Sequence, residues 1–396
     1  MSSRTPSGQA RTSGERAVAR HGWAHALVTV LGGLLAMALV SALGLWAAGA
    51  ADLPDGSFAP VIAATMVTAV GGTVKLAGGA GDLAETRAGL TVIPLSVTLT
   101  GALVIAWGFL RPLRHRAVAG ATELAGWAGR VAALWLLALI GLTLAARHTF
   151  EISLGDDTLG ELGDLFGASP KIGFTTDVPL SVFVGVVWLA GVLVLALLVS
   201  RGAPLPAGLL RFQASVRPAA YAMVALLLAC VVIGVVVALI VAVTKGHARE
   251  TFAVILLGIP NLVWMALTIG LGATWNGRVW WLLVVNVVLL LAAAFVMAAR
   301  SPSRVRAWQH AVHMAVALAL TVFMICLVGR ISAHYGLSVL GIGDLGGGLG
   351  GELFLRPKMW GAVGLAVPWG LVTGFAGALL ARHVRRRGEV RPDSEG

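Results

Sequence analysis

Residues 179–200 read PLSVFVGVVWLAGVLVLALLVS and contain no charged side chain. A bilayer core about 30 Å thick is crossed by about 20 apolar residues in a helix, which rises about 1.5 Å per residue. Because no water reaches the hydrocarbon, the backbone must pair its own N–H and C=O groups, and a helix does this within one segment. The stretch therefore predicts a transmembrane helix.

The rest of the chain repeats this pattern. Long apolar runs recur without the polar alternation that is typical of barrel strands, so the sequence predicts an all-α, polytopic transmembrane helical bundle. Eight runs are firm crossings, and two are broken. In chain order the ten candidate segments are 25–50, 58–77, 91–110, 131–147, 179–200, 218–243, 251–274, 279–299, 307–329 and 360–381.

The two broken segments are the second and the seventh. Gly71 and Gly72 interrupt the second, which ends close to Lys75. Pro260 and Asn261 lie in the middle of the seventh. Glycine and proline both weaken a helix interior. Each segment is therefore expected either to cross the membrane as a kinked helix or to enter and leave it on one side, which gives eight to ten crossings.

The composition excludes a soluble protein. The chain has 396 residues, of which 58% are hydrophobic and 12% charged, and its mean hydropathy is +0.89. Soluble domains average about 25% charged residues, and an exterior with so few charges is suited to lipid rather than to water. The net charge of +11 comes from short basic clusters between apolar runs. This pattern favours a lipid bilayer with anionic lipids at the cytoplasmic face as partner, and no nucleic acid.

Basic residues at both ends of the chain set the expected orientation. Basic segments tend to stay in the cytoplasm, so both termini are expected there, and the number of crossings must be even. Residues 48–51 (AGAA) are similar to a signal-peptide cleavage site, but the preceding apolar stretch exceeds the usual about 7–15 residues, so we expect a retained first helix. The basic residues are Arg4, Arg11, Arg16 and Arg20 before the first segment, and Arg382, Arg385, Arg386 and Arg387 after the last.

Two halves of the chain share one plan. Each has a crossing, a broken segment, a crossing, a basic loop, a crossing, a long Gly-rich loop and a final crossing. The basic loops RPLR at 111–114 and RSPSR at 300–304 occupy the same place. Parallel halves with an even number of crossings fit this plan, and the broken segments are then re-entrant on the outer side; ten full crossings are the alternative. The predicted units are a basic cytoplasmic tail (1–24), a first half (25–201), a cytoplasmic linker (202–217), a second half (218–382) and a basic cytoplasmic tail (383–396).

The sequence lacks several motifs and charged residues that particular classes of enzyme and transporter need. No Asp, Glu, Lys or Arg lies near the middle of the eight firm crossings, which argues against a proton- or voltage-driven machine. The chain has no zincin histidine pair, P-loop or nucleophile elbow, so we expect no enzyme and no cofactor. Cys230 and Cys326 lie inside apolar runs, without the spacing of metal ligands. The acidic loop within 151–177 is expected to be solvated rather than to bind calcium.

Binding candidates come from the broken segments and from rare polar residues. Discontinuous helices at matching positions of two halves are typical of transporter sites, although kinked helices that pack tightly on their neighbours give the same pattern. Polar residues inside the crossings either serve a function or hydrogen-bond between helices, and two of them, four positions apart, share a helix face. The candidates are Gly71, Gly72, Lys75, Pro260, Asn261, Asn276, Asn286, Gln309 and His313.

Four short stretches carry a resemblance to a known family. They are AAGAADLP at 47–54, GGTVK at 71–75, IPNLVW at 259–264 and WNGR at 275–278. In these the chain resembles the streptophobe family, very hydrophobic multi-pass proteins of actinomycetes without an assigned role. The resemblance implies a bacterial plasma membrane and brings no catalytic residues.

The sequence therefore predicts an integral membrane protein of unknown specific function, without evident catalytic machinery. One alternative is a permease or exporter for a small uncharged or lipophilic solute, with the broken segments lining its site. The other is a membrane scaffold or assembly partner. The sequence leaves the substrate, the protein partner and the oligomeric state open.

Overall fold

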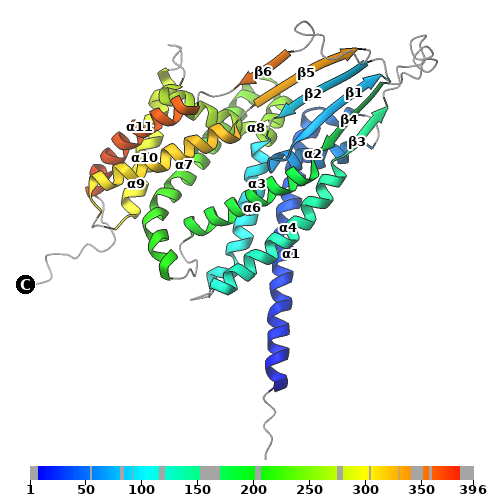
Figure 1. The fold of residues 1–396 in the computed structure, drawn as a ribbon. Helices are drawn as coiled ribbons and strands as arrows, with labels where there is room; N and C mark the ends of the chain where they lie inside the picture. Colours follow the sequence, from blue (N-terminus) through cyan, green and yellow to red (C-terminus); the bar gives the residue numbers. More distant parts are fainter. Residues whose placement is uncertain are drawn as a thin grey trace, which may run out of the picture.

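A computed structural model gives the fold (Figure 1). It describes the residues 8–53, 56–80, 84–91, 93–115, 121–151, 170–200, 207–273, 280–302, 305–329, 331–339, 351–355 and 359–383. Of the predicted sites, Asn276 lies outside these ranges, as does most of the acidic loop.

The chain folds into a bundle of apolar helices, which confirms the predicted fold class. Most long helices are apolar on every side, as expected where lipid and protein interior have similar polarity. Short 3₁₀ turns at Ala50–Asp52, Pro112–His115 and Ala381–His383 follow three of the helices. The α-helices are α1 (Gly8–Ala47), α2 (Phe58–Ala69), α3 (Leu95–Leu110), α4 (Ala121–Ala145), α6 (Val178–Val199), α7 (Ala207–Lys245), α8 (Ala248–Thr268), α9 (Trp280–Arg300), α10 (Ala307–Val328) and α11 (Met359–Leu380).

Connecting segments form a sheet at one end of this bundle, which the sequence analysis did not predict (Figure 1). The strands pair antiparallel in the order β3-β4-β1-β2-β5-β6. The β2–β5 pair joins the first half of the chain to the second, with Ala84 opposite Val339 and Thr91 opposite Ser332. The strands are β1 (Val74–Ala80), β2 (Ala84–Thr91), β3 (His148–Glu151), β4 (Pro170–Thr176), β5 (Ile331–Val339) and β6 (Gly351–Leu355).

The sheet defines one end of the bundle, the sheet end. The pair β1–β2 connects α2 to α3, β3–β4 connects α4 to α6, and β5–β6 connects α10 to α11. Consequently α3, α6 and α11 begin at the sheet end, and α2, α4 and α10 finish there. The helix α1 also finishes there, because it runs antiparallel to α3: Thr29 packs on Gly108, and Met37 on Gly101.

The opposite end is the basic end, where α7 begins and α9 finishes. Gln213, near the start of α7, donates a hydrogen bond to the carbonyl of Ser200, just after α6. The guanidinium of Arg300, the last residue of α9, lies 3.6 Å from the ring centroid of Tyr221 in α7. Because α7 starts here and α9 finishes here, α7 must finish and α9 must begin at the sheet end. The described arginines at the basic end include Arg111, Arg130, Arg217, Arg300, Arg306 and Arg382.

Helix α8 starts and finishes at the sheet end. Near its start, Arg249 Nη2 donates to the carbonyl of Trp46 at the end of α1, at 3.2 Å. Near its finish, Asn286 Nδ2 in the second turn of α9 donates to the carbonyl of Leu267, at 2.7 Å. Among the described residues, eight helices are long and apolar enough to span a membrane, and these include α8 but not the 16-residue α3. Relative to the two ends of the bundle, α3 runs from the sheet end to the basic end, whereas α2 and α8 start and finish at the sheet end. The helices α2 and α8 are called here the re-entrant helices.

Proline does not break the seventh predicted segment. The helix α8 is continuous through the buried Pro260 and passes into a π-helical turn, Ile269–Ala273. The break lies at Gly272, whose φ of 96° is left-handed. The expected interruption at Pro260–Asn261 was therefore placed too early. Gly71, after α2, has a φ of 90°, so both re-entrant helices end at a glycine that an L side chain would strain.

The two halves repeat the same packing. In the first, α1 packs against α2, α3 and α4; α2 against α3 and α4; and α6 against α3 and α4. In the second, α7 packs against α8, α9 and α10; α8 against α9 and α10; and α11 against α9 and α10. Each half also has its own hydrophobic core. The described helices thus follow one plan twice, while the predicted domain boundaries remain a prediction.

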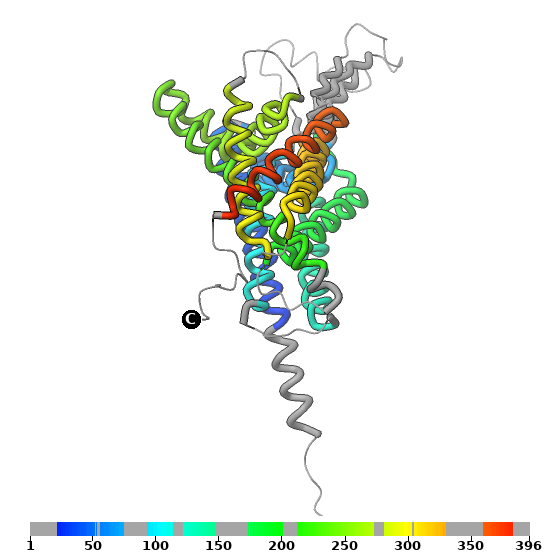
Figure 2. The backbone as a smooth tube through the Cα atoms, turned by 90° about the vertical axis from the view of Figure 1, so that its left-hand side faces the viewer, coloured from blue at the N-terminus to red at the C-terminus, as the bar shows by residue number. Residues whose placement is uncertain are grey.

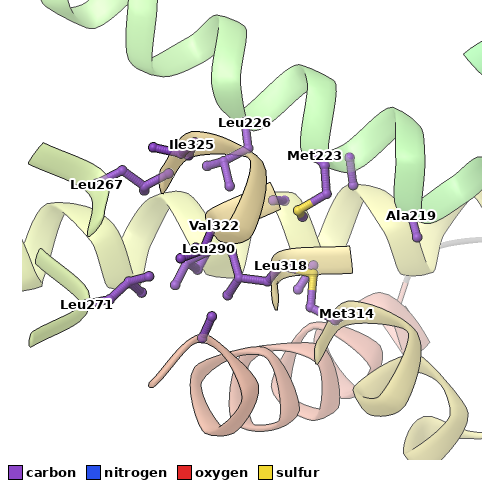
Figure 3. Close-up of a cluster of buried hydrophobic side chains, with 14 of the residues drawn as sticks. Ala219, Met223, Leu226, Leu267, Leu271, Leu290, Met314, Leu318, Val322 and Ile325 are labelled. Atoms are coloured by element: carbon purple, nitrogen blue, oxygen red, sulfur yellow. The ribbon is translucent and has the colours of Figure 1, made fainter. Parts of the chain in front are cut away.

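The second core lies where five helices meet (Figure 3). Met223 and Leu226 of α7 face Leu290 of α9 and Met314 and Leu318 of α10. All five side chains are buried. In the tube view, the C-terminal part of α7 extends away from this core with α8 beside it (Figure 2).

Candidate functional site

The junction of the halves is built around α8, which belongs to the second half but packs along α1 and α3 of the first. Gly44 of α1 allows the closest approach. A Cβ at Gly44 would lie 2.7 Å from Leu257 Cγ and 3.2 Å from Leu256 Cβ, so only glycine lets α8 come this near. Arg249 adds a charged contact, because its guanidinium lies 5.7 Å from the ring centroid of Trp46.

Asn261 connects α8 to the first turn of α3. Its Oδ1 accepts a hydrogen bond from the Leu95 N–H at 3.1 Å, and its Nδ2 donates to the Ile93 carbonyl at 2.9 Å. Pro94, the residue before α3, makes no side-chain cap. Helix N-termini leave backbone donors without intrahelical partners. Asn261 therefore caps α3 from the other half of the molecule.

The first turn of α3 holds both re-entrant helices. Ser96 Oγ donates to the Ile255 carbonyl of α8 at 2.8 Å. Thr98, two residues further and therefore on the opposite side of the helix, donates to the Ala69 carbonyl at the end of α2, at 2.6 Å. The start of α3 thus contacts both predicted broken segments, on opposite sides of the helix.

A small cavity lies beside Asn261. Its volume is about 20 Å³, which is enough for one small group. Residues of both halves line it, and none of them is charged. They are Leu95, Asn261, Trp264, Met265, Thr268, Ile325, Cys326 and Gly329.

The end of α2 is closely packed. A Cβ at Gly72 would lie 2.9 Å from Ser181 Oγ in α6, and a Cβ at Gly71 would lie 2.7 Å from Val184 Cγ1. The hydroxyls of Ser181 and Thr73 are buried without a hydrogen-bond partner in the described structure. The predicted candidates Gly71 and Gly72 therefore form a tight contact with the last helix of their half.

The end of α8 repeats this arrangement. Trp369 of α11, the last helix of the second half, donates through Nε1 to the Leu271 carbonyl at 3.1 Å. Asn286 of α9 holds the Leu267 carbonyl, as Thr98 of α3 holds Ala69. Matching helices in the two halves thus bind the ends of the two re-entrant segments.

The remaining predicted residues have other roles. Lys75 lies in β1, opposite Thr175 of β4. The Gln309 side chain accepts a hydrogen bond from the Arg306 N–H at 2.9 Å and so caps α10. His313 is exposed on the outside of α10, whereas His310 is buried against α11. Gln309 and His313 therefore do not join the site at α8.

Sequence reasoning did not identify Ser96, Trp264, Thr268 and Cys326 as residues of the site. Each lies in a run that is apolar on every side, so the spacing does not show which face points inward. Among the described residues, no group of three His, Cys, Asp or Glu could hold a metal ion. The cavity is suited to small uncharged groups, because none of the described residues that line it is charged.

The chain stands apart from the proteins it was compared with. No family model, no curated protein and no solved structure matches it.

Proposed function

We propose that this integral membrane protein is a scaffold or assembly partner whose two halves act as one rigid body, and not an enzyme. The observation that carries the proposal is that described hydrogen bonds tie the halves together at the sheet end, while at the basic end the segment that joins the halves is held to the end of α6. A carrier that works by rocking one repeat against the other must open first one end and then the other.

At the sheet end the ties are numerous. Asn261 caps α3, Ser96 holds the Ile255 carbonyl, and Arg249 holds the Trp46 carbonyl. The β2–β5 pair adds a backbone ladder between the halves. Opening this end would break all these contacts, several of them in surroundings with little water to replace them.

At the basic end α6 and α7 are joined directly. The amide of Gln213, which is 7% exposed, donates to the Leu197 carbonyl and, at 3.2 Å, to the Ser200 carbonyl. A rocking motion of the two halves would leave this buried amide without its hydrogen-bond acceptors. Ties at both ends favour a fixed arrangement over alternating access.

The setting is part of the proposal. We place the basic end in the cytoplasm of a bacterial plasma membrane, following the positive-inside tendency of its arginines. The streptophobe resemblance of residues 47–54, 71–75, 259–264 and 275–278 supports the bacterial setting.

Distances between spin labels test the rigidity. One pair replaces Trp107 and Trp308 at the basic end, and the other replaces Leu180 and Trp360 at the sheet end; all four are exposed. We expect one narrow distance distribution for each pair in lipid nanodiscs. The proposal would be overturned if each pair gave two distances, and if the distance at one end were long in the state in which the distance at the other end is short.

Isolation in native membrane discs tests for a partner. A scaffold should be recovered in a complex of reproducible composition, with mass above that of the chain. Recovery of the chain alone, in discs of several polymer types, would contradict an assembly role.

A permease is the second candidate, favoured by the uncharged cavity between the halves. Its lining is suited to a small uncharged or lipophilic solute. Thr268→Cys and Asn261→Cys, in a chain with Cys230 and Cys326 replaced by alanine, would report water access. Protection of both cysteines from polar reagents on both sides of the membrane would end this candidate.

A further inference from the structure

At the basic end, the ends of α9, α10 and α11 meet around small side chains. Ala298 of α9 and Ala378 of α11 are buried together with Ala381, which follows α11, and Ala307 of α10 packs against them. Because alanine is short, the three helix ends approach closely here.

Each of these helix ends bears an arginine. Arg300 follows Ala298 by two residues, Arg306 directly precedes Ala307, and Arg382 directly follows Ala381. All three side chains are exposed. The alanine packing thus brings three arginines to neighbouring helix ends, called here the arginine patch (Arg300, Arg306 and Arg382).

The neighbouring helices offer this patch no counter-charge. The sequences of α7, α9, α10 and α11 contain no Asp and no Glu. Arg300 stacks on the ring of Tyr221, which fixes its plane but adds no negative charge. The corresponding end of the first half differs, because α4 brings Glu123 there.

Helix dipoles do not neutralise the patch. The C-termini of α9 and α11 contribute about −0.5 charge each, and the N-terminus of α10 about +0.5. Three full positive charges exceed this sum several-fold. The described helix ends therefore leave the patch with a net positive charge, which attracts anions.

The surroundings indicate which anion. Trp308, one helical position after Ala307, is 57% exposed, as expected of a side chain at headgroup level. Below it, Val312, Val316 and Leu320 form an exposed apolar stripe along α10. Arginine binds phosphate oxygens through paired N–H groups, and the stripe fits acyl chains.

We propose that the arginine patch is a binding site for the phosphate headgroup of an anionic phospholipid, with its acyl chains along α10. The proposal is independent of the scaffold function, since either a scaffold or a permease would carry such a site. Free phosphate has the same chemical group as the lipid headgroup, but it would make no contact with Trp308 or with the apolar stripe of α10.

Lipid retention tests the site. The purified full chain is incubated with vesicles of phosphatidylglycerol and phosphatidylcholine in equal amounts, re-isolated, and its bound lipid quantified by mass spectrometry. We expect the unmodified chain to retain phosphatidylglycerol preferentially. Each of R300Q, R306Q and R382Q should lower that preference by about fivefold, the effect of one arginine near a charged surface.

The controls separate charge from folding. R306K keeps the charge and should keep most of the preference. K245Q removes an exposed positive charge at the sheet end and should leave the preference unchanged. Each variant must elute as a single species of unchanged size. Where a glutamine variant does not, the lysine variant at the same position is used instead. Retention by the lysine variant is then measured at raised salt concentration, which should weaken the binding of phosphatidylglycerol.

Two results would overturn the proposal. The first is an equal preference in the unmodified chain and in R300Q, R306Q and R382Q. The second is complete displacement of the lipid by millimolar inorganic phosphate, which would identify a free-anion site.

Discussion

Asn261 of α8 completes the first turn of α3, 166 positions away in the sequence, by accepting the Leu95 N–H at 3.1 Å and donating to the Ile93 carbonyl at 2.9 Å. One amide thereby satisfies a donor and an acceptor of the other half. Because Leu95 is the first residue of α3, this contact lies at the sheet end of the bundle, where the halves meet.

Replacement of Asn261 by leucine should destabilise the protein by about 1–2 kcal/mol. Leucine has a similar volume but leaves the Leu95 N–H and the Ile93 carbonyl without their partner. Melting in detergent, followed by size-exclusion chromatography, measures the effect. Thr244→Val, which removes a hydrogen bond to the helix's own backbone on an exposed surface, is the control and should change stability little. An unchanged melting temperature for Asn261→Leu would show that the cap is dispensable.

Thr98 and Asn286 allow a test of the internal repeat. Each donates from the third helix of its half to a carbonyl near the end of a re-entrant helix, at 2.6 Å and 2.7 Å. Thr98→Val and Asn286→Leu should each destabilise by about 1 kcal/mol. In the double variant the losses should add within about 0.5 kcal/mol, since the sites share no partner. Strong non-additivity would show that the two ends are coupled across the junction.

Sequence reasoning predicted the helical class and the limits of most helices because length and lack of charge decide these. It could not decide which side of a helix faces protein. In α10 both His310 and His313 lie in an apolar run, and only packing shows that His310 is buried and His313 exposed. Where lipid replaces water, the inward and outward faces differ little in polarity.

The position of the second break could not be predicted from the sequence either. Proline at 260 suggested an interruption, yet neighbouring helices hold α8 together there, as membrane surroundings often allow. The chain unwinds at Gly272 instead. The sheet was missed because its strands lie in long Gly-rich connections, whose pairing depends on partners far along the chain, such as β2 with β5.

Two glycines of α11 should respond oppositely to the same change. A Cβ at Gly374 would lie 2.8 Å from Ala311 Cα and 2.9 Å from the His310 carbonyl oxygen, so Gly374→Ala must push α10 and α11 apart and should destabilise by about 1–3 kcal/mol. Gly364 has nothing within 4 Å of its Cβ position, so Gly364→Ala should be neutral or stabilise by up to about 1 kcal/mol, because alanine favours a helix. Thermal melting of both variants checks this. Equal effects would mean that the α10–α11 contact is looser than described.

Accessibility labelling decides between eight and ten crossings. Single cysteines replace Gly246, between α7 and α8, and Trp281, at the start of α9, in a chain with Cys230 and Cys326 changed to alanine. Because α8 begins and finishes at the sheet end, both cysteines should react with a membrane-impermeant maleimide from the same side. Trp107→Cys and Trp308→Cys, at the basic end, should react only from the other side. Reaction of Gly246→Cys and Trp281→Cys from opposite sides would make α8 a full crossing and would remove the parallel arrangement of the two halves.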